Sequence, residues 1–191
     1  MIRASFKEFL NIYKGDNAKC VEVGVNEGYN AEAMLLHNKD IHLTLVDFYD
    51  VYDKRQDPVE AEEMYKQMCK RVQPFKDRVN IIRKESHHAA KLFDNESLDY
   101  VYIDANHSKD AVRLDIVSWF PKVKLGGMIS GHDQNQVVEH IRDLLSSIVT
   151  ERLGLDWWMI KTRSSDIPVE LQRQFIEEYA KLRKEYMQCQ T

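Results

Sequence analysis

The segment from Val21 to Gly28 reads VEVGVNEG, and the segment from Leu43 to Asp47 reads LTLVD. Each begins as an apolar strand; the first then enters a glycine turn, and the second ends on a carboxylate. A strand, a glycine turn, a helix and a second strand in this order build a nucleoside pocket at the carboxyl ends of the strands of an α/β sheet. Gly24 and Gly28 allow the backbone angles and close approaches that such a turn needs. These two segments therefore predict the fold class and the position of a ligand site.

Asp47 is placed to bind the ribose of that ligand. It follows Gly24 by 23 residues, about the spacing at which a carboxylate accepts from the two hydroxyls of a ribose. The dinucleotide fingerprint is not met, because Asn26 and Tyr29 stand where its second and third glycines belong. Glu22 would repel a phosphate but hold a cationic group. A nucleoside with a positively charged substituent is therefore favoured over NAD.

Length and composition predict one cytoplasmic domain over residues 1–191. The chain is long enough for a sizeable core, and its 30% charged and 43% hydrophobic residues are ordinary for soluble proteins. A net charge of −4 with scattered basic residues argues against a nucleic-acid partner. There is no run of 18 apolar residues and no signal-peptide core, so no membrane partner is expected. The cysteines, which lack metal-ligand spacing, are Cys20, Cys69 and Cys189.

Short apolar runs predict the strands of the sheet. They alternate with segments of helical periodicity, as a doubly wound sheet requires. The runs are Cys20–Val23, Leu43–Val46, Val79–Ile82, Leu98–Ile103, Gly127–Ile129 and Trp157–Ile160. A further edge strand within Ser147–Leu153 is expected to pair antiparallel with Trp157–Lys161. We predict a doubly wound, mostly parallel, seven-stranded Rossmann-like α/β sheet with helices on both faces.

Helical periodicity predicts the elements between the strands. The segments are Ser5–Lys14, Tyr29–His37, Val59–Phe75 and, at the C-terminus, about 168–187. Met64, Met68 and Val72 lie on an apolar stripe of the third segment, which we assign to the core. The C-terminal helix has one apolar face that packs on the domain or forms a dimer contact. The sequence thus leaves both a monomer and a homodimer open.

Carboxylate and imidazole side chains follow the fourth and fifth predicted strands. The fourth continues as LDYVYIDANHS and the fifth as GGMISGHDQ. The carboxyl ends of neighbouring parallel strands lie at one edge of a sheet, so these side chains should face one crevice. Burying unpaired charge is costly, so such clustering indicates a site rather than a core. The residues are Asp104, His107, His132 and Asp133.

These segments resemble those of class I S-adenosylmethionine-dependent methyltransferases. Glu22, Gly24 and Gly28 match the first motif of that family, an acidic residue followed by spaced glycines, although Asn26 stands where a glycine is commoner. Asp47 matches the ribose-binding acid of the second motif. The resemblance implies a single methyltransferase domain with S-adenosylmethionine as cofactor. The implied cofactor-binding residues are Glu22, Gly24, Asn26, Gly28, Asp47, Phe48, Ser86 and Asp104.

The fourth and fifth strand ends resemble a subgroup of small-molecule O-methyltransferases. Its members carry Ile-Asp-x-x-His and then Gly-Gly with His-Asp, and Asp115 matches a further acid on the intervening helix. In the related catechol and caffeoyl-coenzyme-A enzymes, the positions of Asp104, Asp133 and Gln134 hold a divalent metal, with asparagine in place of Gln134. His107 falls where those enzymes have a catalytic lysine. The resemblance covers residues 20–161.

Removing a proton from an acceptor hydroxyl is the chemistry that these residues would serve. His107 is our candidate general base, because imidazole titrates near pH ~6.5. Mg²⁺ held by Asp104, Asp133 and Gln134 would lower the pKa of the hydroxyl. In the alternative interpretation, Asp104 contacts the sulfonium side of the cofactor and His107 caps the helix that follows Ser108.

Several neighbouring residues have two interpretations each. His132 is a second base or orients the adjacent carboxylate, and Asp115 is more easily explained as a structural pair than as a catalytic acid. Ser86 matches the position that binds the adenine edge, and it is also a candidate N-cap of a helix beginning at His87. His87 and His88 are adjacent, so we expect them to face different directions on the surface.

The aromatic segment that begins at Phe48 is the candidate source of contacts to adenine or to the acceptor, with core packing or a lid as alternatives. We expect an O-methyltransferase that acts on a hydroxyl of a sugar or glycan, with His107 and Asp104 as catalytic residues. A small phenol or catechol is the alternative acceptor. A non-catalytic S-adenosylmethionine-binding partner module is the alternative function, and an NAD-dependent reductase is disfavoured by Asn26 and Tyr29.

Overall fold

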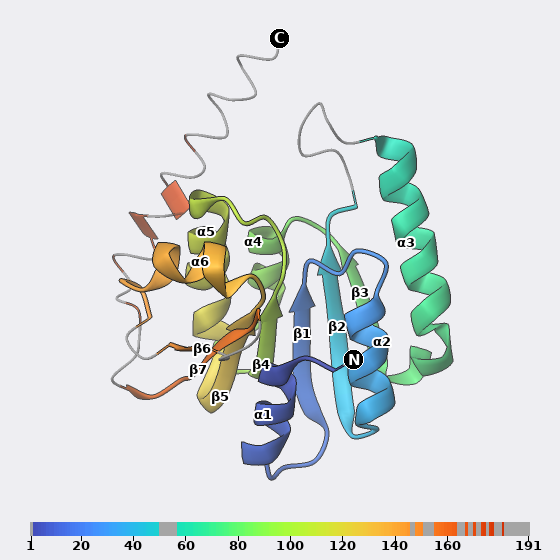
Figure 1. The fold of residues 1–191 in the computed structure, drawn as a ribbon, viewed down its shortest axis with the longest axis horizontal. Coiled ribbons are helices and arrows are strands. Elements are labelled where there is room, and N and C mark those ends of the chain that lie inside the picture. Colours follow the sequence, from blue (N-terminus) through green and yellow to red (C-terminus); the bar gives the residue numbers. More distant parts are fainter. Residues whose placement is uncertain are drawn as a thin grey trace.

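A computed structural model describes residues 2–49, 57–145, 148–150 and 155–163, together with residues 167, 170, 173, 174, 176, 177 and 181. Within this part of the chain, seven strands form one sheet in the order β3-β2-β1-β4-β5-β7-β6 (Figure 1). They are β1 (Ala18–Val23), β2 (Ile41–Asp47), β3 (Val79–Arg83), β4 (Leu98–Ile103), β5 (Val123–Gly131), β6 (Val149–Thr150) and β7 (Trp157–Ile160). The first five run parallel, and β7 is antiparallel to both β5 and β6. The predicted doubly wound, mostly parallel sheet is confirmed.

Helices cover both faces of the sheet, as Figure 1 shows. Those of the described residues are α1 (Ala4–Ile12), α2 (Tyr29–His37), α3 (Pro58–Val72), α4 (Ser86–Ala89), α5 (Lys109–Trp119) and α6 (Gln134–Ile141). The first three pack in one apolar layer and the last three in the other, because alternate side chains of each strand point to opposite faces. None of these helices has the length and hydropathy of a membrane span.

The element boundaries follow the predictions with a few differences. Strands β4 and β7 and helix α2 begin and end where predicted, whereas β5 starts at Val123 rather than Gly127 because two glycines interrupt its apolar run. The predicted helix over Val59–Phe75 stops at Val72, since a 3₁₀ turn with a proline follows. Strand β6 confirms the antiparallel edge pairing where it is described. Residues 151–154 and most of the predicted C-terminal helix lie outside the described residues.

Gly24, which follows β1, packs against the backbone that follows β4. Its φ is +81°, and a Cβ atom there would lie 2.2 Å from the backbone oxygen of Asp104. Gly28 also has a positive φ, and it is the N-cap residue of α2, next to the side chain of Met68. The glycine turn therefore packs directly on the backbone of Asp104, which brings the two motif segments together.

Candidate functional site

The carboxyl ends of β1, β2, β4 and β5 lie level at one edge of the sheet (Figure 1). Val23 of β1 is in register with Val46 of β2 and with Ile103 of β4, and Ile103 is in register with Gly131 of β5. The amide of Asp104 donates to the carbonyl oxygen of Val23 at 2.7 Å. The structure therefore places the loops that follow these four strands side by side. The motif residues on them share this edge.

Asp47 organises the glycine turn. Its Oδ2 accepts hydrogen bonds from the backbone amides of Val25 at 2.8 Å and Asn26 at 3.1 Å, and its Oδ1 accepts one from the amide of Tyr49 at 3.2 Å. Oδ2 already accepts two hydrogen bonds, whereas Oδ1 accepts one and has a lone pair left, so a ribose hydroxyl can still donate to Oδ1. Asp47 thus holds the loop that would surround the ligand.

Tyr49 belongs to the aromatic segment that begins at Phe48, and it packs in the core, as one of the alternatives for that segment anticipated. Its side chain is buried, and its hydroxyl donates to the carbonyl oxygen of Asn26 at 2.6 Å. Arg83, at the end of β3, donates to the carbonyl oxygen of Tyr49 at 2.7 Å. The first bond ties the segment after β2 to the glycine turn, and the second ties it to the end of β3. Phe48, the predicted aromatic contact, is half-buried beside it.

Glu22 is a buried carboxylate with an incomplete set of partners. The residue is 2% exposed, and Asn30 donates to its Oε1 at 3.1 Å. Its Oε2 is buried and has no hydrogen-bond partner among the described residues. Burial raises the pKa of Glu22 to about 8. A cationic group of a ligand would supply the missing interaction and favour the ionised form.

Two imidazoles and two carboxylates meet at the ends of β4 and β5. His107 Nε2 lies 3.1 Å from Asp133 Oδ2 and 3.6 Å from Asp104 Oδ1. His132 Nδ1 lies 3.1 Å from the same oxygen of Asp133 and 3.8 Å from Asp104 Oδ1. Burial raises the pKa of Asp104, although His132 and a neighbouring arginine oppose the shift. The structure thus brings together all four side chains that the sequence placed in one crevice.

Arg3 completes this cluster from a distant part of the chain. Its Nη1 lies 2.6 Å from His132 Nε2, and its Nη2 lies 3.6 Å from Asp104 Oδ2. A guanidinium only donates, so His132 Nε2 must accept, and the proton of a neutral His132 then sits on Nδ1, toward Asp133. Helix α1 holds Arg3 here because Ser5, in its first turn, donates to the buried carboxylate of Asp156. No sequence motif indicates this contact.

A family model described as a methyltransferase domain matches residues 21–134, more than half of the chain. The chain belongs to this methyltransferase family. Its members use S-adenosylmethionine, so the protein is an S-adenosylmethionine-dependent methyltransferase. A comparison with curated proteins finds no match.

Solved structures share the fold of this methyltransferase at low sequence identity. Spermidine synthase from Thermotoga maritima matches with a TM-score of 0.52 and 14% identity over 89% of this chain and 65% of that chain, so our chain spans about two thirds of its length. A protein from Corynebacterium glutamicum matches with a TM-score of 0.56 and 13% identity over 82% and 80% of the two chains. An rRNA methylase from Streptococcus thermophilus matches with a TM-score of 0.55 and 10% identity over 83% and 95%. These likenesses establish the fold alone.

His107 occupies an unexpected position relative to the predicted metal ligands. Ligand atoms of Asp104, His107 and Asp133 lie within 4.8 Å of one another, which is compatible with one metal ion. His107 Nε2 is buried and makes no aligned hydrogen bond within the described residues, even though Asp133 Oδ2 is only 3.1 Å away. Gln134, the third predicted ligand, begins α6 half-buried, and its backbone amide donates to Leu155. The imidazole can therefore serve the methyltransferase as a base or as a ligand.

Ser86 faces the interior rather than capping a helix. Helix α4 begins at Ser86 itself with Glu85 as its N-cap, so the predicted N-cap role of Ser86 is wrong. The hydroxyl of Ser86 accepts from the Trp119 indole at 2.8 Å and bonds to Asp115. Asp115 is buried, and burial raises its pKa to about 7. The pairing of Ser86 with Asp115 joins α4 to α5, as the structural interpretation of Asp115 anticipated.

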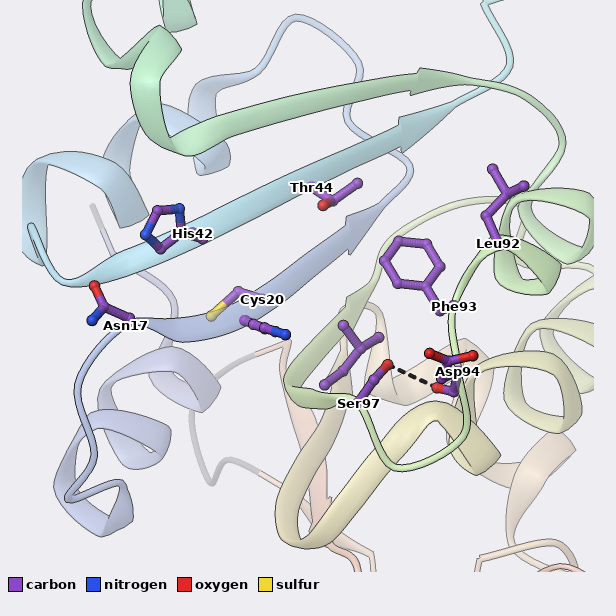
Figure 2. Close-up of a pocket in the computed structure, with 10 residues that line it drawn as sticks. Asn17, Cys20, His42, Thr44, Leu92, Phe93, Asp94 and Ser97 are labelled. Atoms are coloured by element: carbon purple, nitrogen blue, oxygen red, sulfur yellow. Dashed lines mark hydrogen bonds between the residues drawn. The ribbon is translucent and has the colours of Figure 1, made fainter.

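A groove of about 560 Å³ lies on the α4–α5 face of the sheet, away from the motif residues (Figure 2). Helix α4 is only one turn long, so this part of the sheet is left uncovered. Lys19 and His42 come from the starts of β1 and β2, whereas the motif residues follow the strand ends. The groove is lined by Asn17, Lys19, Cys20, His42, Thr44, Leu92, Phe93, Asp94, Ser97 and Leu98. None of the predicted chemistry lies there.

Proposed function

We propose that this methyltransferase transfers the methyl group of S-adenosylmethionine to a hydroxyl oxygen of a sugar or glycan. The observation that carries the proposal is the cluster of His107, His132, Asp104 and Asp133 beside the glycine turn. Methylation of a hydroxyl requires that its proton leave as the methyl group arrives. An imidazole backed by a carboxylate is suited to accept that proton near neutral pH.

We assign the cofactor to the carboxyl ends of β1 and β2. Asp47 would accept from the ribose hydroxyls, and the unsatisfied oxygen of Glu22 would face the positively charged end of the cofactor. When bound, S-adenosylmethionine supplies a methyl group activated by a sulfonium. The backbone of Gly24, Asn26 and Gly28 would line the pocket between the ribose and the positively charged end of the cofactor. Phe48 and the backbone at Ser86 remain our candidates for the adenine edge, since the Ser86 hydroxyl is engaged by Trp119.

His107 is the preferred general base. Both nitrogens of His132 already have neighbours, Arg3 at Nε2 and Asp133 at Nδ1. His107 has Asp133 on one side to stabilise the imidazolium that proton transfer would create. His132 then has the role of orienting Asp133 rather than acting as a second base.

Mg²⁺ remains a candidate second cofactor of the same site. Asp104 and Asp133 are half-buried and offer carboxylate oxygens, and Gln134 offers an amide oxygen, which together suit a hard cation. A bound Mg²⁺ would lower the pKa of the acceptor hydroxyl. If the ion also bound His107, the imidazole would lose its role as a base.

The acceptor is proposed to be a terminal sugar, because no described segment forms a separate acceptor-binding domain above the edge. The test is a screen of free sugars, glycosides, phenols and catechols for formation of S-adenosylhomocysteine, with and without Mg²⁺. We expect turnover with a sugar hydroxyl. Turnover with catechols alone would contradict the sugar assignment. Tight cofactor binding without turnover of any acceptor would favour a non-catalytic binding module.

A further inference from the structure

We propose that Glu85, His87 and His88 form a second metal site, one that binds a transition-metal dication such as Zn²⁺ or Co²⁺. The three residues lie after β3 and on α4. The expectation that the adjacent histidines face different directions is wrong: their ring centroids are 4.0 Å apart, and both imidazoles approach Glu85. The chain thus gathers two imidazoles and one carboxylate at a place where the proposed catalytic chemistry uses none of them.

The ligand atoms are close enough for a tetrahedral site after small side-chain rotations. Glu85 Oε2 lies 3.3 Å from His88 Nδ1 and 3.8 Å from His87 Nε2, and all three atoms lie within 4.8 Å of one another. Tetrahedral Zn²⁺ with bonds of about 2.0–2.1 Å holds its ligand atoms about 3.4 Å apart. Of the three pairs, Glu85 and His88 already have that separation; Glu85 and His87, at 3.8 Å, and the two histidines, within 4.8 Å, would reach it by small rotations of the imidazole rings.

The local structure explains why these three groups converge. Glu85 is the N-cap residue of α4, and one helical turn places His88 above it at i+3. The hydroxyl of Ser86 is bonded to Trp119 and Asp115 of α5, which holds this short helix in place. Two of the candidate ligands are therefore attached to a braced turn rather than to a free loop.

Burial and ligand type indicate the kind of ion. The side chains of Glu85 and His87 are 11% and 15% exposed, whereas that of His88 is 54% exposed. Two ligands are thus preorganised and one faces solvent, which leaves room for a water as the fourth ligand. Imidazole nitrogens favour Zn²⁺, Co²⁺, Ni²⁺ or Cu²⁺ over Mg²⁺.

This site is separate from the cluster at the ends of β4 and β5. Strands β2 and β1 lie between β3 and β4 in the sheet. The two clusters share no residue. Occupancy of one can therefore be measured while the other is disabled.

The test is a Co²⁺ titration of tag-free protein carrying Asp133→Asn, in excess Mg²⁺, followed by the visible absorption of the ion. The substitution removes one of the three candidate ligands of the other cluster, and Mg²⁺ competes for its remaining carboxylate. We expect one Co²⁺ per chain with the intense spectrum of tetrahedral coordination. Adding His88→Ala or Glu85→Gln should weaken binding at least about tenfold, since even second-shell changes cost about 10–100-fold. His88 is mostly exposed, so its removal should leave the fold intact.

The matched control is His42→Ala, which removes an exposed histidine at the other end of the sheet and should leave Co²⁺ affinity unchanged. Equal affinities of the His42→Ala and His88→Ala proteins would overturn the proposal. So would a spectrum of hydrated octahedral Co²⁺ or the lack of saturable binding. Glu85 would then only lie in contact with the two imidazoles.

Discussion

At the scale of a single residue, Glu22 connects the proposed cofactor binding to the stability of the fold. The residue is 2% exposed, and one of its carboxylate oxygens has no hydrogen-bond partner among the described residues. An unsatisfied buried polar atom destabilises a folded protein unless a ligand completes it. We therefore interpret this residue as a binding group whose partner is the cationic cofactor.

The raised pKa of Glu22 predicts how stability depends on pH without cofactor. Its pKa rises from 4.5 to about 8 on folding, so the folded state binds the proton more tightly and loses stability as pH increases between these values. Glu22→Gln should flatten this part of the pH dependence. Asp115, with a pKa raised to about 7, should leave a residual slope below that pH. Urea unfolding between pH ~4.5 and ~8 measures both, and identical slopes in the two proteins would contradict the assignment.

Asp47 should determine cofactor affinity. Removing hydrogen bonds to a charged group costs about 1.5–3 kcal/mol, so Asp47→Ala should weaken S-adenosylmethionine binding by roughly 10–100-fold. Asp47→Asn is the matched variant, because its amide oxygen can still accept from the amides of Val25 and Asn26. Calorimetry gives both dissociation constants. An unchanged value in Asp47→Ala would refute ribose binding by this residue.

His107→Ala tests the proton-transfer step. General-base catalysis contributes about 10²–10⁴-fold, so turnover should fall by that range while cofactor affinity stays the same. His132→Ala, which removes the partner of Arg3 instead, should affect turnover less. Steady-state formation of S-adenosylhomocysteine with a saturating acceptor is the measurement. Full activity of His107→Ala at neutral pH would remove it as the base.

At the scale of elements, the glycine turn between β1 and α2 has a packing role in addition to the cofactor binding that we propose for it. Gly24 approaches the backbone of Asp104 so closely that no side chain fits, and its amide donates to the carbonyl oxygen of Val46 at 2.9 Å. The turn thus links the ends of β1, β2 and β4. Any distortion of the turn would move both the residues proposed to bind the cofactor and the cluster of Asp104, Asp133 and the two histidines.

Gly24→Ala should therefore destabilise the fold far more than Gly126→Ala. Both glycines have φ near +80°, but a Cβ on Gly126 would meet no atom within 4 Å. Backbone strain alone should cost about 1–2 kcal/mol in Gly126→Ala. The additional clash should raise the cost in Gly24→Ala to on the order of 3 kcal/mol or more. Equal losses in urea unfolding would show that the close approach to Asp104 is not needed.

At the scale of the whole molecule, the site depends on segments from most of the chain. Helix α1 brings Arg3, β1 and β2 bring the residues proposed to bind the cofactor, and the loops after β4 and β5 bring the acid–imidazole cluster. Because the ligand would contact several of these segments at once, its binding should stabilise the fold as a unit.

S-adenosylmethionine should accordingly raise the melting temperature. At about 100 times its dissociation constant, a ligand that binds only the folded state adds about 2.7 kcal/mol. NAD should give no comparable shift, because Asn26 and Tyr29 stand where the dinucleotide fingerprint has glycines. Differential scanning fluorimetry with both compounds is sufficient. A shift with NAD and none with S-adenosylmethionine would contradict the cofactor assignment.

The sequence by itself determined the strand and helix pattern, because hydrophobic periodicity, glycine turns and strand-end carboxylates are local signals. It therefore predicted the sheet, the helix Tyr29–His37 and the shared edge of Asp47, Asp104 and Asp133. Only the tertiary structure decided the contact of Arg3 with His132, which are 129 residues apart, and the turning of Ser86 toward Trp119. The convergence of Glu85, His87 and His88 likewise appears only in three dimensions. Such contacts depend on how packed elements and side-chain rotamers fit together, and no pattern within a short stretch of residues records that fit.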